Sequence, residues 1–269
     1  MLCTCGGLHG ALVLRELRAS GRFDIRGVVR STRVLDPHDG FLRGALAHVR
    51  RSGLAYAGYL WCATSLSDWL GALGGVDAAA GTAAGPRPAE FATRDLNETN
   101  GLRFLAACKP DIVISAFFNQ RLHSPALALP RLGCVNIHPS LLPAARGVDP
   151  VFQSLLQGAR RVGVTVHFMV TDLDSGPIIA QQAIDAPAGS SVFALTAQLF
   201  LTGAGLLSST VDLVANGAAG LAQSGAGDYQ SWPSREEMRA FHARGGRLVR
   251  LADLARVARG WPAREHRAP

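Results

Sequence analysis

The chain has 269 residues, 48% of them hydrophobic, which suffices for a sizeable core in one large domain or in one domain with a small appendage. The formal net charge is +7, yet the basic residues are almost all arginine and lie dispersed, with Lys109 the only lysine. Only Arg50-Arg51 and Arg160-Arg161 are adjacent, and no stretch interleaves basic with aromatic residues. The charge therefore favours a solvated, arginine-rich surface over a nucleic-acid partner.

Cysteine usage and the first residues bear on location and metal binding. Five scattered cysteines, an odd number, favour reduced thiols in a cytoplasmic protein over a disulfide framework. Cys3 and Cys5, with His9 nearby, offer one pair of zinc ligands, but a structural site needs four and no second pair follows, so we expect no metal. No basic segment with an apolar core and a cleavage site opens the chain, which disfavours secretion.

The chain opens with the order strand, turn, helix, strand, which is typical of a doubly wound fold. The expected elements are a strand at Leu2 to Cys5, a glycine-containing turn, a helix at Ala11 to Ala19 and a strand at Phe23 to Arg30. The first strand is short for a central position, which leaves open a truncated segment or a misplaced start codon. The turn, Gly-Gly-Leu-His-Gly, lacks the G-x-G-x-x-G spacing of dinucleotide sites, so a nicotinamide cofactor is disfavoured.

Helices and strands alternate through the rest of the chain, which predicts an α/β fold, doubly wound around a mostly parallel sheet. Residues 40–72 are expected to be largely helical and Asp77 to Pro88 to be a low-complexity loop. Further strands are expected near Glu90 to Thr93, Asp111 to Phe117, Gly163 to Val170 and Pro177 to Ile184, and further helices near Asn97 to Cys108 and Ser191 to Val214. We place the main domain at residues 1–205 and a C-terminal helix end with a short extension, packed on that domain, at residues 206–269.

The longest charge-free run, Gly189 to Val211, is long enough to span a bilayer. It contains many Ser, Thr, Gln and Gly residues, and its larger apolar residues recur at helical spacing, at Val192, Leu195, Leu199 and Leu206. The pattern predicts an amphipathic helix lying on a sheet and no membrane contact.

Two polar side chains interrupt an apolar run in the stretch CVNIHPSLLPAARG, Cys134 to Gly147. Asn136 and His138 are two residues apart, so in a strand they project from the same face. Pro139 cannot continue a ladder of backbone hydrogen bonds, which predicts that the strand ends there. In open parallel α/β sheets, ligands bind beyond the carboxyl ends of the strands, so this pair marks a candidate site.

The turn TDLDSG, Thr171 to Gly176, supplies a second candidate element between two expected strands. Asp172 taken alone fits ordinary turn chemistry with a solvated carboxylate. Asp174, placed at the same sheet edge as Asn136 and His138, completes a set of carboxylate, imidazole and carboxamide. These groups supply a base or orienter, an acid and an oxyanion donor, the parts needed to transfer an acyl group.

The segments NIHPSLLPAARG and GVTVHFMVTDLDSGPII resemble the signature of the folate-dependent formyltransferases. The resemblance covers about residues 90–205 well and the opening loosely, and it implies the formyltransferase fold, with a Rossmann-like sheet. It also implies 10-formyltetrahydrofolate as co-substrate and Asn136, His138 and Asp174 as the catalytic triad. Asn136 then donates to the oxyanion, and His138 donates to it or protonates the departing folate nitrogen. Asp174 orients His138 or accepts the amine proton through a water.

Further site residues follow from the same resemblance. The folate is expected between two segments and held largely by backbone groups of Phe118, Asn119, Gln120, Arg121, Leu122, Thr171, Asp172 and Leu173. The acceptor side is expected to involve Ser140, Arg146, Gly147 and His167. Taken alone, Arg121 fits a surface cation, Arg146-Gly147 a turn, and His167 either core packing or support of the catalytic groups.

Departures from the resembling enzymes favour transfer to the amine of a small molecule, such as an amino sugar, an amino-acid-like compound or a specialised metabolite. The turn after the first strand lacks the polar residues with which the ribonucleotide enzyme binds phosphate. About 60 residues follow Gly205, fewer than the C-terminal barrel of methionyl-tRNA formyltransferases needs, and no room is left for the regulatory domain of formyltetrahydrofolate hydrolase. The ending YQSWP resembles tails of stand-alone enzymes, although packing alone accounts for Tyr229, Trp232 and Pro233.

Several alternatives stay open at this level. A formyltetrahydrofolate hydrolase, a methionyl-tRNA formyltransferase-like enzyme and a catalytically silent folate-binding module all remain, although a silent module would be marked by a replaced triad residue and none is replaced. Acceptor recognition is expected in residues 5–10, 35–60 and the tail. The aromatic-rich helix around Tyr56 to Trp69 fits core packing or a subunit contact, so a homodimer is an alternative to a monomer.

Overall fold

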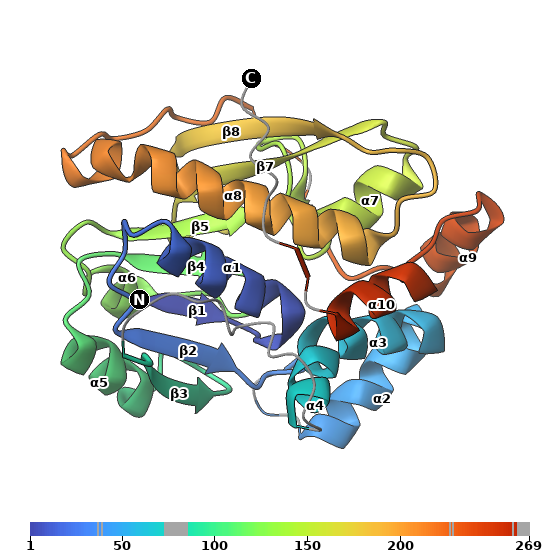
Figure 1. Ribbon diagram of the computed structural model, residues 1–269, viewed down its shortest axis with the longest axis horizontal. Coiled ribbons are helices and arrows are strands. Elements are labelled where there is room, and N and C mark those ends of the chain that lie inside the picture. The colour runs from blue at the N-terminus through green and yellow to red at the C-terminus, as the bar shows by residue number, and fades with distance from the viewer. Residues whose placement is uncertain are drawn as a thin grey trace.

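The computed structural model describes residues 1–36, 38, 40–72, 86–225, 227, 229–259 and 261–262. Within them a seven-stranded sheet runs in the order β3-β2-β1-β4-β5-β7-β8 (Figure 1). β1 to β5 pair in parallel, whereas β7 pairs antiparallel with both β5 and β8. The strands are β1 (Leu2–Thr4), β2 (Gly27–Ser31), β3 (Ala89–Thr93), β4 (Val113–Ala116), β5 (Cys134–His138), β7 (Arg161–Phe168) and β8 (Ile178–Asp185). The α/β fold with a mostly parallel, doubly wound sheet, expected from the sequence, is confirmed.

The sheet separates two apolar cores, and strand side chains alternate between them. In β4, Ile114 belongs to one core and Val113 to the other, and in β5, Val135 and Cys134 divide in the same way. Burial on both faces explains why these strands read as continuous apolar runs in the sequence. The first core lies under α1 (Gly7–Ala19) and α8 (Val192–Ala215), and the second lies under α5 (Thr99–Cys108) and α6 (Ser124–Leu127) (Figure 1).

The charge-free run forms α8, which is long and apolar enough by composition to cross a bilayer. However, 67% of its most apolar window is buried inside the molecule, against α1, β5, β7 and β8. Ser191 caps its first turn by accepting a hydrogen bond from the Ala194 amide at 3.1 Å. Packing on the sheet therefore accounts for the apolar composition of this helix.

Residues 41–72 form a helical cluster at the carboxyl ends of β1 and β2 (Figure 1). It consists of α2 (Phe41–Ser52), α3 (Leu54–Trp61), the π-helical turn η1 (Cys62–Leu66) and α4 (Ser67–Ala72). Tyr56 and Tyr59 are buried in the core, whereas Trp61 and Trp69 are exposed, so this segment serves the core and also presents aromatic rings to the surface. The loop expected at Asp77 to Pro88 lies mostly outside the described residues.

The η1 turn closes over the glycine turn that begins α1. A Cβ atom at Gly7 would lie 2.2 Å from the Ala63 carbonyl oxygen, and Gly7 itself has φ +62°. Arg30 packs against Gly6 and forms an ion pair with Asp68. The amino-terminal end of α1 is therefore covered by protein groups.

The chain after α8 folds back onto the main unit, and we call residues 216–262 the extension. Its elements are β9 (Tyr229–Gln230), α9 (Arg235–Ala243) and α10 (Leu251–Ala258). β9 pairs in parallel with β6 (Arg146–Gly147), just ahead of α7 (Pro150–Leu156). Ser52 donates a hydrogen bond to the Pro233 oxygen, and Arg15 donates to the Trp261 oxygen at 2.6 Å. The extension is therefore attached to the helices as well as to β6.

Candidate active site

Asn136 and His138 lie on one face at the carboxyl end of β5, as their two-residue spacing requires. In the antiparallel pairing with β7, Asn136 stands opposite His167 and His138 opposite Thr165. The register therefore places two histidines and a carboxamide on adjacent strands, where the sheet ends.

His138 has an acceptor oxygen near each ring nitrogen. Its Nε2 lies 3.1 Å from the Ala145 oxygen, which can only accept, so this nitrogen is the donor. Its Nδ1 lies 3.6 Å from Oδ1 of Asp174, too long for a hydrogen bond but close enough for an electrostatic contact. Ser140 also donates to the Ala145 oxygen, at 2.6 Å. The loop between Ser140 and Ala145 thereby holds the imidazole, whose side chain is only 6% exposed.

Asp174 turns its carboxylate toward the sheet and away from solvent, with its side chain 13% exposed. Its backbone has φ +53°, a left-handed conformation that aspartate tolerates better than most residues. Oδ2 accepts a hydrogen bond from the Gly147 amide at 3.1 Å, and Oδ1 lies 3.9 Å from Nε2 of His167. The turn thus brings its carboxylate to both histidines.

His167 orients Asn136. Its Nδ1 lies 2.8 Å from the Phe168 oxygen and therefore carries the proton, which leaves Nε2 to accept from Nδ2 of Asn136 at 3.2 Å. Burial, followed by the charge of His138, lowers the pKa of His167 to about 4, although Asp174 acts in the opposite direction. A neutral His167 at physiological pH fixes the Asn136 amide nitrogen toward it. The second N–H of that carboxamide remains for another acceptor.

Residues of β7 and β8 fix the loop beyond His138. Thr165 donates to the Ser140 oxygen at 2.6 Å and accepts from the Leu142 amide at 3.1 Å. Gln181 donates to the Leu142 oxygen and to the Thr165 hydroxyl, both at 2.8 Å. Thr165 lies within one of the quoted signature segments and Gln181 outside both, and neither was singled out from the sequence, because each acts through pairing across strands.

Arg146 and Gly147 form the short strand β6, and the simple turn considered from the sequence does not describe them. Gly147 has φ +121°, and a Cβ atom there would lie 1.9 Å from the Gln230 oxygen, so this position requires glycine. The Arg146 Nη2 atom lies 3.4 Å from Oε1 of Gln223, while its buried Nε has no hydrogen-bond partner among the described residues.

The two segments expected to hold the folate, residues 118–122 and 171–173, lie next to each other. The Arg121 guanidinium lies 3.6 Å from the Asp172 carboxylate. Thr171, Asp172 and Leu173 are exposed on the turn. Phe118 is half-buried at the surface of the second core. These side chains remain accessible to a ligand.

In residues 118–122, the side chains of Asn119, Gln120 and Leu122 make contacts within the protein. Asn119 accepts from Ser31 and donates to the Arg33 oxygen. Gln120 is buried, accepts from the Leu96 amide at 2.7 Å and donates to the Ser31 hydroxyl and the Thr93 oxygen, and Leu122 is buried in the second core. Asn119, Gln120 and Leu122 therefore fix the path of the loop, which leaves their backbone groups for any contact with a folate.

The extension contributes Gln223, a residue of the site that sequence reasoning missed. Gln223 donates to the main-chain oxygens of Asp174 and Gly176. Tyr229 stands opposite Arg146 in the pairing of β9 with β6, and partial burial, followed by the negative charge of Asp174, raises its pKa. The motif YQSWP had singled out Tyr229, whereas nothing local marks Gln223.

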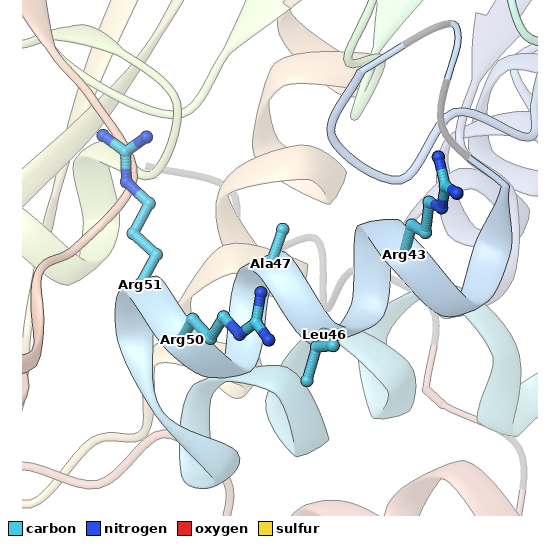
Figure 2. Close-up of a pocket in the computed structure, with 5 residues that line it drawn as sticks. All are labelled: Arg43, Leu46, Ala47, Arg50 and Arg51. Atoms are coloured by element: carbon cyan, nitrogen blue, oxygen red, sulfur yellow. The ribbon is translucent and has the colours of Figure 1, made fainter.

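Two cavities lie outside this cluster. One, of about 680 Å³, lies along α2 and is lined by Arg43, Leu46, Ala47, Arg50 and Arg51 (Figure 2). Another, of about 570 Å³, lies between the end of α7, the loop before α8 and the end of α9. The first falls within residues 35–60, the range in which acceptor recognition is expected.

No group of three or more His, Cys, Asp or Glu side chains positioned for a metal ion occurs among the described residues. Cys3 and Cys5 are free thiols, and burial raises the pKa of each to about 12. These thiols are therefore protonated and weakly nucleophilic at neutral pH.

Known proteins similar to this chain are formyltransferases. A methionyl-tRNA formyltransferase of Roseiflexus sp. (strain RS-1) is 44% identical over 114 residues, which are 42% of this chain and 35% of that protein. The enzyme of the same name from Thermotoga maritima is 47% identical over 89 residues, which are 33% of this chain and 28% of that protein. The match thus spans about a third of the length of these curated relatives.

Solved structures share the fold at lower identity. Glycinamide ribonucleotide transformylase 1 from Symbiobacterium toebii matches with a TM-score of 0.53 at 20% identity, over 83% of this chain and 92% of that chain. A sugar N-formyltransferase from Shewanella sp FDAARGOS_354 matches with a TM-score of 0.53 at 17% identity, over 86% and 75%. The sequence profile described as formyl transferase matches residues 66–210, more than half of the chain. The chain therefore belongs to the formyl transferase family.

Proposed function

We propose that this protein transfers a formyl group from 10-formyltetrahydrofolate to the amine of a small molecule. The observation that carries the proposal is the buried cluster in which Asp174 contacts His138 and His167, while His167 holds Asn136. Family membership supplies the class of reaction, and the cluster supplies the polar groups that the reaction needs.

In the proposed reaction, the neutral amine attacks the formyl carbon and a tetrahedral intermediate forms, with negative charge on the former carbonyl oxygen. The N–H of Asn136 that does not face His167 donates to that oxygen. Asp174 takes the proton that the amine loses, directly or through a water. His138 protonates the folate nitrogen as its bond to carbon breaks, which yields the formamide and tetrahydrofolate.

Two features of the surface support a folate beside the Asp174 turn. The contact between Arg121 and Asp172 joins the two segments expected to hold it. Val170 and Leu173, on and beside the turn, expose 40% and 43% of their surface, so apolar groups are available to a flat heterocycle.

The closed glycine turn supports an acceptor without a phosphate at that position. A helix amino terminus next to a glycine turn is a common phosphate site, because its N–H groups are free to donate. Here Gly7 meets the backbone of Ala63, and Arg30 with Asp68 covers Gly6. This arrangement favours an amino sugar, amino-acid-like or specialised-metabolite acceptor over a phosphoribosyl amine bound in the manner of a P-loop ligand.

A second candidate acceptor is methionyl-tRNA, which the 44% identity to a methionyl-tRNA formyltransferase favours. Arg43 and Arg50 on α2 make no ion pair among the described residues and are available to phosphates (Figure 2). The arginines of this chain are dispersed, whereas a specific RNA site has clustered basic residues. The charge pattern therefore gives methionyl-tRNA only weak support.

The test is incubation of the purified chain with 10-formyltetrahydrofolate and, separately, a panel of small amines, charged initiator methionyl-tRNA, or water alone. Mass gain of a formyl group on an amine, absent with the Asp174→Asn variant, supports the proposal. Formylated tRNA supports the second candidate instead. Rapid loss of the formyl group to water identifies a hydrolase, and folate binding without turnover in any arm identifies a silent module.

Location and assembly are further proposals. Five cysteines without a disulfide support a cytoplasmic protein. The exposed rings of Trp61 and Trp69 support a homodimer formed through the helical cluster, which light scattering of the purified chain tests against a Trp69→Gln variant.

A further inference from the structure

The side chain of Gln223 holds the Asp174 turn from outside the turn itself. Its Nε2 lies 2.9 Å from the Asp174 oxygen and 2.7 Å from the Gly176 oxygen, so one amide group donates to both carbonyls. Its Oε1 lies 3.4 Å from the Arg146 guanidinium. A single residue of the extension thus reaches the Asp174 turn and β6.

The turn needs such support because its conformation is unfavourable for an isolated chain. Asp174 has φ +53°, and non-glycine residues persist in the left-handed region when surrounding contacts hold them there. Gly176 packs directly on the Phe168 backbone, where a Cβ atom would lie 1.9 Å from the carbonyl oxygen. The carbonyls of both residues face the side-chain amide of Gln223.

The same part of the extension also fixes the opposite wall of the cluster. Leu221 and Ile178 exchange two main-chain hydrogen bonds of 2.7 Å just beyond the turn. The Val148 amide donates to the Gln230 oxygen at 3.0 Å, and Gly147 in turn donates to the Asp174 carboxylate at 3.1 Å. Leu221, Gln223 and Gln230 therefore hold the Asp174 turn and the Gly147 strand in one relative position.

We infer that Gln223 is a positioning residue for the proposed formyl transfer: it fixes the Asp174 main chain so that the carboxylate faces His138. This inference rests on the proposed function for its kinetic consequence and on the described contacts for its structural one. Gln223 does not touch the reacting atoms. Because small displacements of reacting groups cost up to about 10²-fold in rate, loss of this support should lower kcat roughly 10- to 100-fold with little change in KM.

Two variants separate positioning from general stability. Gln223→Ala removes both hydrogen bonds to the turn, whereas Gln223→Glu keeps the size and the acceptor oxygen that faces Arg146 but loses the donor when ionised. A glutamate side chain beside the Arg146 guanidinium is ionised at neutral pH, so both variants should lower kcat to a similar extent. Ser224→Ala, an exposed neighbour, is the matched control.

Amide hydrogen exchange of Gly147 gives a readout that needs no turnover, since this amide donates to Asp174. The inference predicts faster Gly147 exchange in Gln223→Ala than in wild type or Ser224→Ala, with all three chains folded by circular dichroism. Wild-type kcat in Gln223→Ala or in Gln223→Glu overturns it. If wild type turns over no substrate, the proposed function fails and the exchange result alone decides: unchanged protection of Gly147 then overturns the positioning role, and lost protection supports it.

Discussion

The amide nitrogen of Asn136 lies 3.2 Å from Nε2 of His167, and this contact decides which way the carboxamide faces. Because Nδ1 of His167 donates a hydrogen bond to the Phe168 oxygen, Nε2 of the neutral ring can only accept. We therefore propose that the buried histidine supports Asn136 as the oxyanion donor of the proposed reaction.

His167→Ala should lower kcat roughly tenfold, because Asn136 loses its partner and samples orientations that do not reach the oxyanion. The loss should be smaller than that of Asn136→Ala, since removing a donor outright costs ~10² to 10³ in rate. Steady-state kinetics with the formyl donor measures both. His242→Ala, on the exposed face of α9, is the control, and equal rates for His167→Ala and His242→Ala would contradict the role.

Asn136→Ala, His138→Ala and Asp174→Asn should each cut turnover at least tenfold while the protein stays folded. Each removes a group with a separate task, and a positioned acid or base supplies ~10² to 10⁴ in rate. Asp174→Asn retains an oxygen that can accept from the Gly147 amide, so the fall in its turnover measures the contribution of the negative charge. Wild-type rates in any of the three, measured alongside thermal unfolding, would remove that residue from the assignment.

Gly7→Ala should destabilise the protein far more than Gly21→Ala, although both glycines have left-handed backbones, with φ +62° and +65°. The backbone cost of a β-carbon there is roughly 1–2 kcal/mol in each case. At Gly21 nothing lies within 4 Å, whereas at Gly7 the new carbon would meet the Ala63 oxygen at 2.2 Å. Urea unfolding of both variants isolates the cost of the close contact, and equal losses would show that η1 moves away freely.

The contribution of His9 to stability should fall as the pH drops below about 6.5. Burial lowers the pKa of His9 to about 4, and the Phe193 oxygen only partly opposes this. Between pH 6.5 and 4 the unfolded chain binds a proton that folded His9 does not, so the free energy of unfolding decreases by at most about 1.4 kcal/mol per pH unit for one group. His9→Leu should flatten that slope in urea titrations. An unchanged slope would mean that His9 is protonated in the fold.

Tyr56→Phe should cost more stability at pH 8 than at pH 5. The Tyr56 hydroxyl donates to the buried Asp149 carboxylate at 2.8 Å, and burial raises the pKa of Asp149 to about 6. Above that pH the lost donor faces a charge, a difference worth about 1.5–3 kcal/mol against about 1 kcal/mol for a neutral acid. Tyr59→Phe removes a neighbouring buried hydroxyl as the control. A pH-independent cost in urea unfolding would indicate that Asp149 stays in one protonation state.

Local sequence patterns predicted which segments are strands and helices. Where a strand begins and ends depends on the neighbouring strand with which it pairs. The strand expected from Phe23 begins at Gly27, because its neighbour in the sheet begins at Ala89 and the register pairs those two residues. Asp24 and Arg26 are exposed and pair with each other at 2.8 Å. Their apolar neighbour Ile25 gave a strand-like pattern, and no single sequence shows the partner that is missing there.

For the candidate site, the spacing of Asn136 and His138 sufficed to place both on one face of a strand. Placing His167 against Asn136 required the register of β5 with β7, which depends on tertiary pairing. Gln223 had no detectable signal, since a glutamine in a polar loop is ordinary and its contacts lie 49 positions away in the chain.

The separation of Asp174 and Gln223 along the chain means that the turn is translated before the residue that holds it. At about 5–20 residues per second, the ribosome adds the 49 residues from Asp174 to Gln223 in roughly 2–10 s, and α8 is made in between. For this interval a nascent chain carries every motif of the cluster without the segment that aligns it. The aligned arrangement of the cluster is therefore completed late, when Leu221, Gln223 and Gln230 have emerged and can contact groups translated long before them.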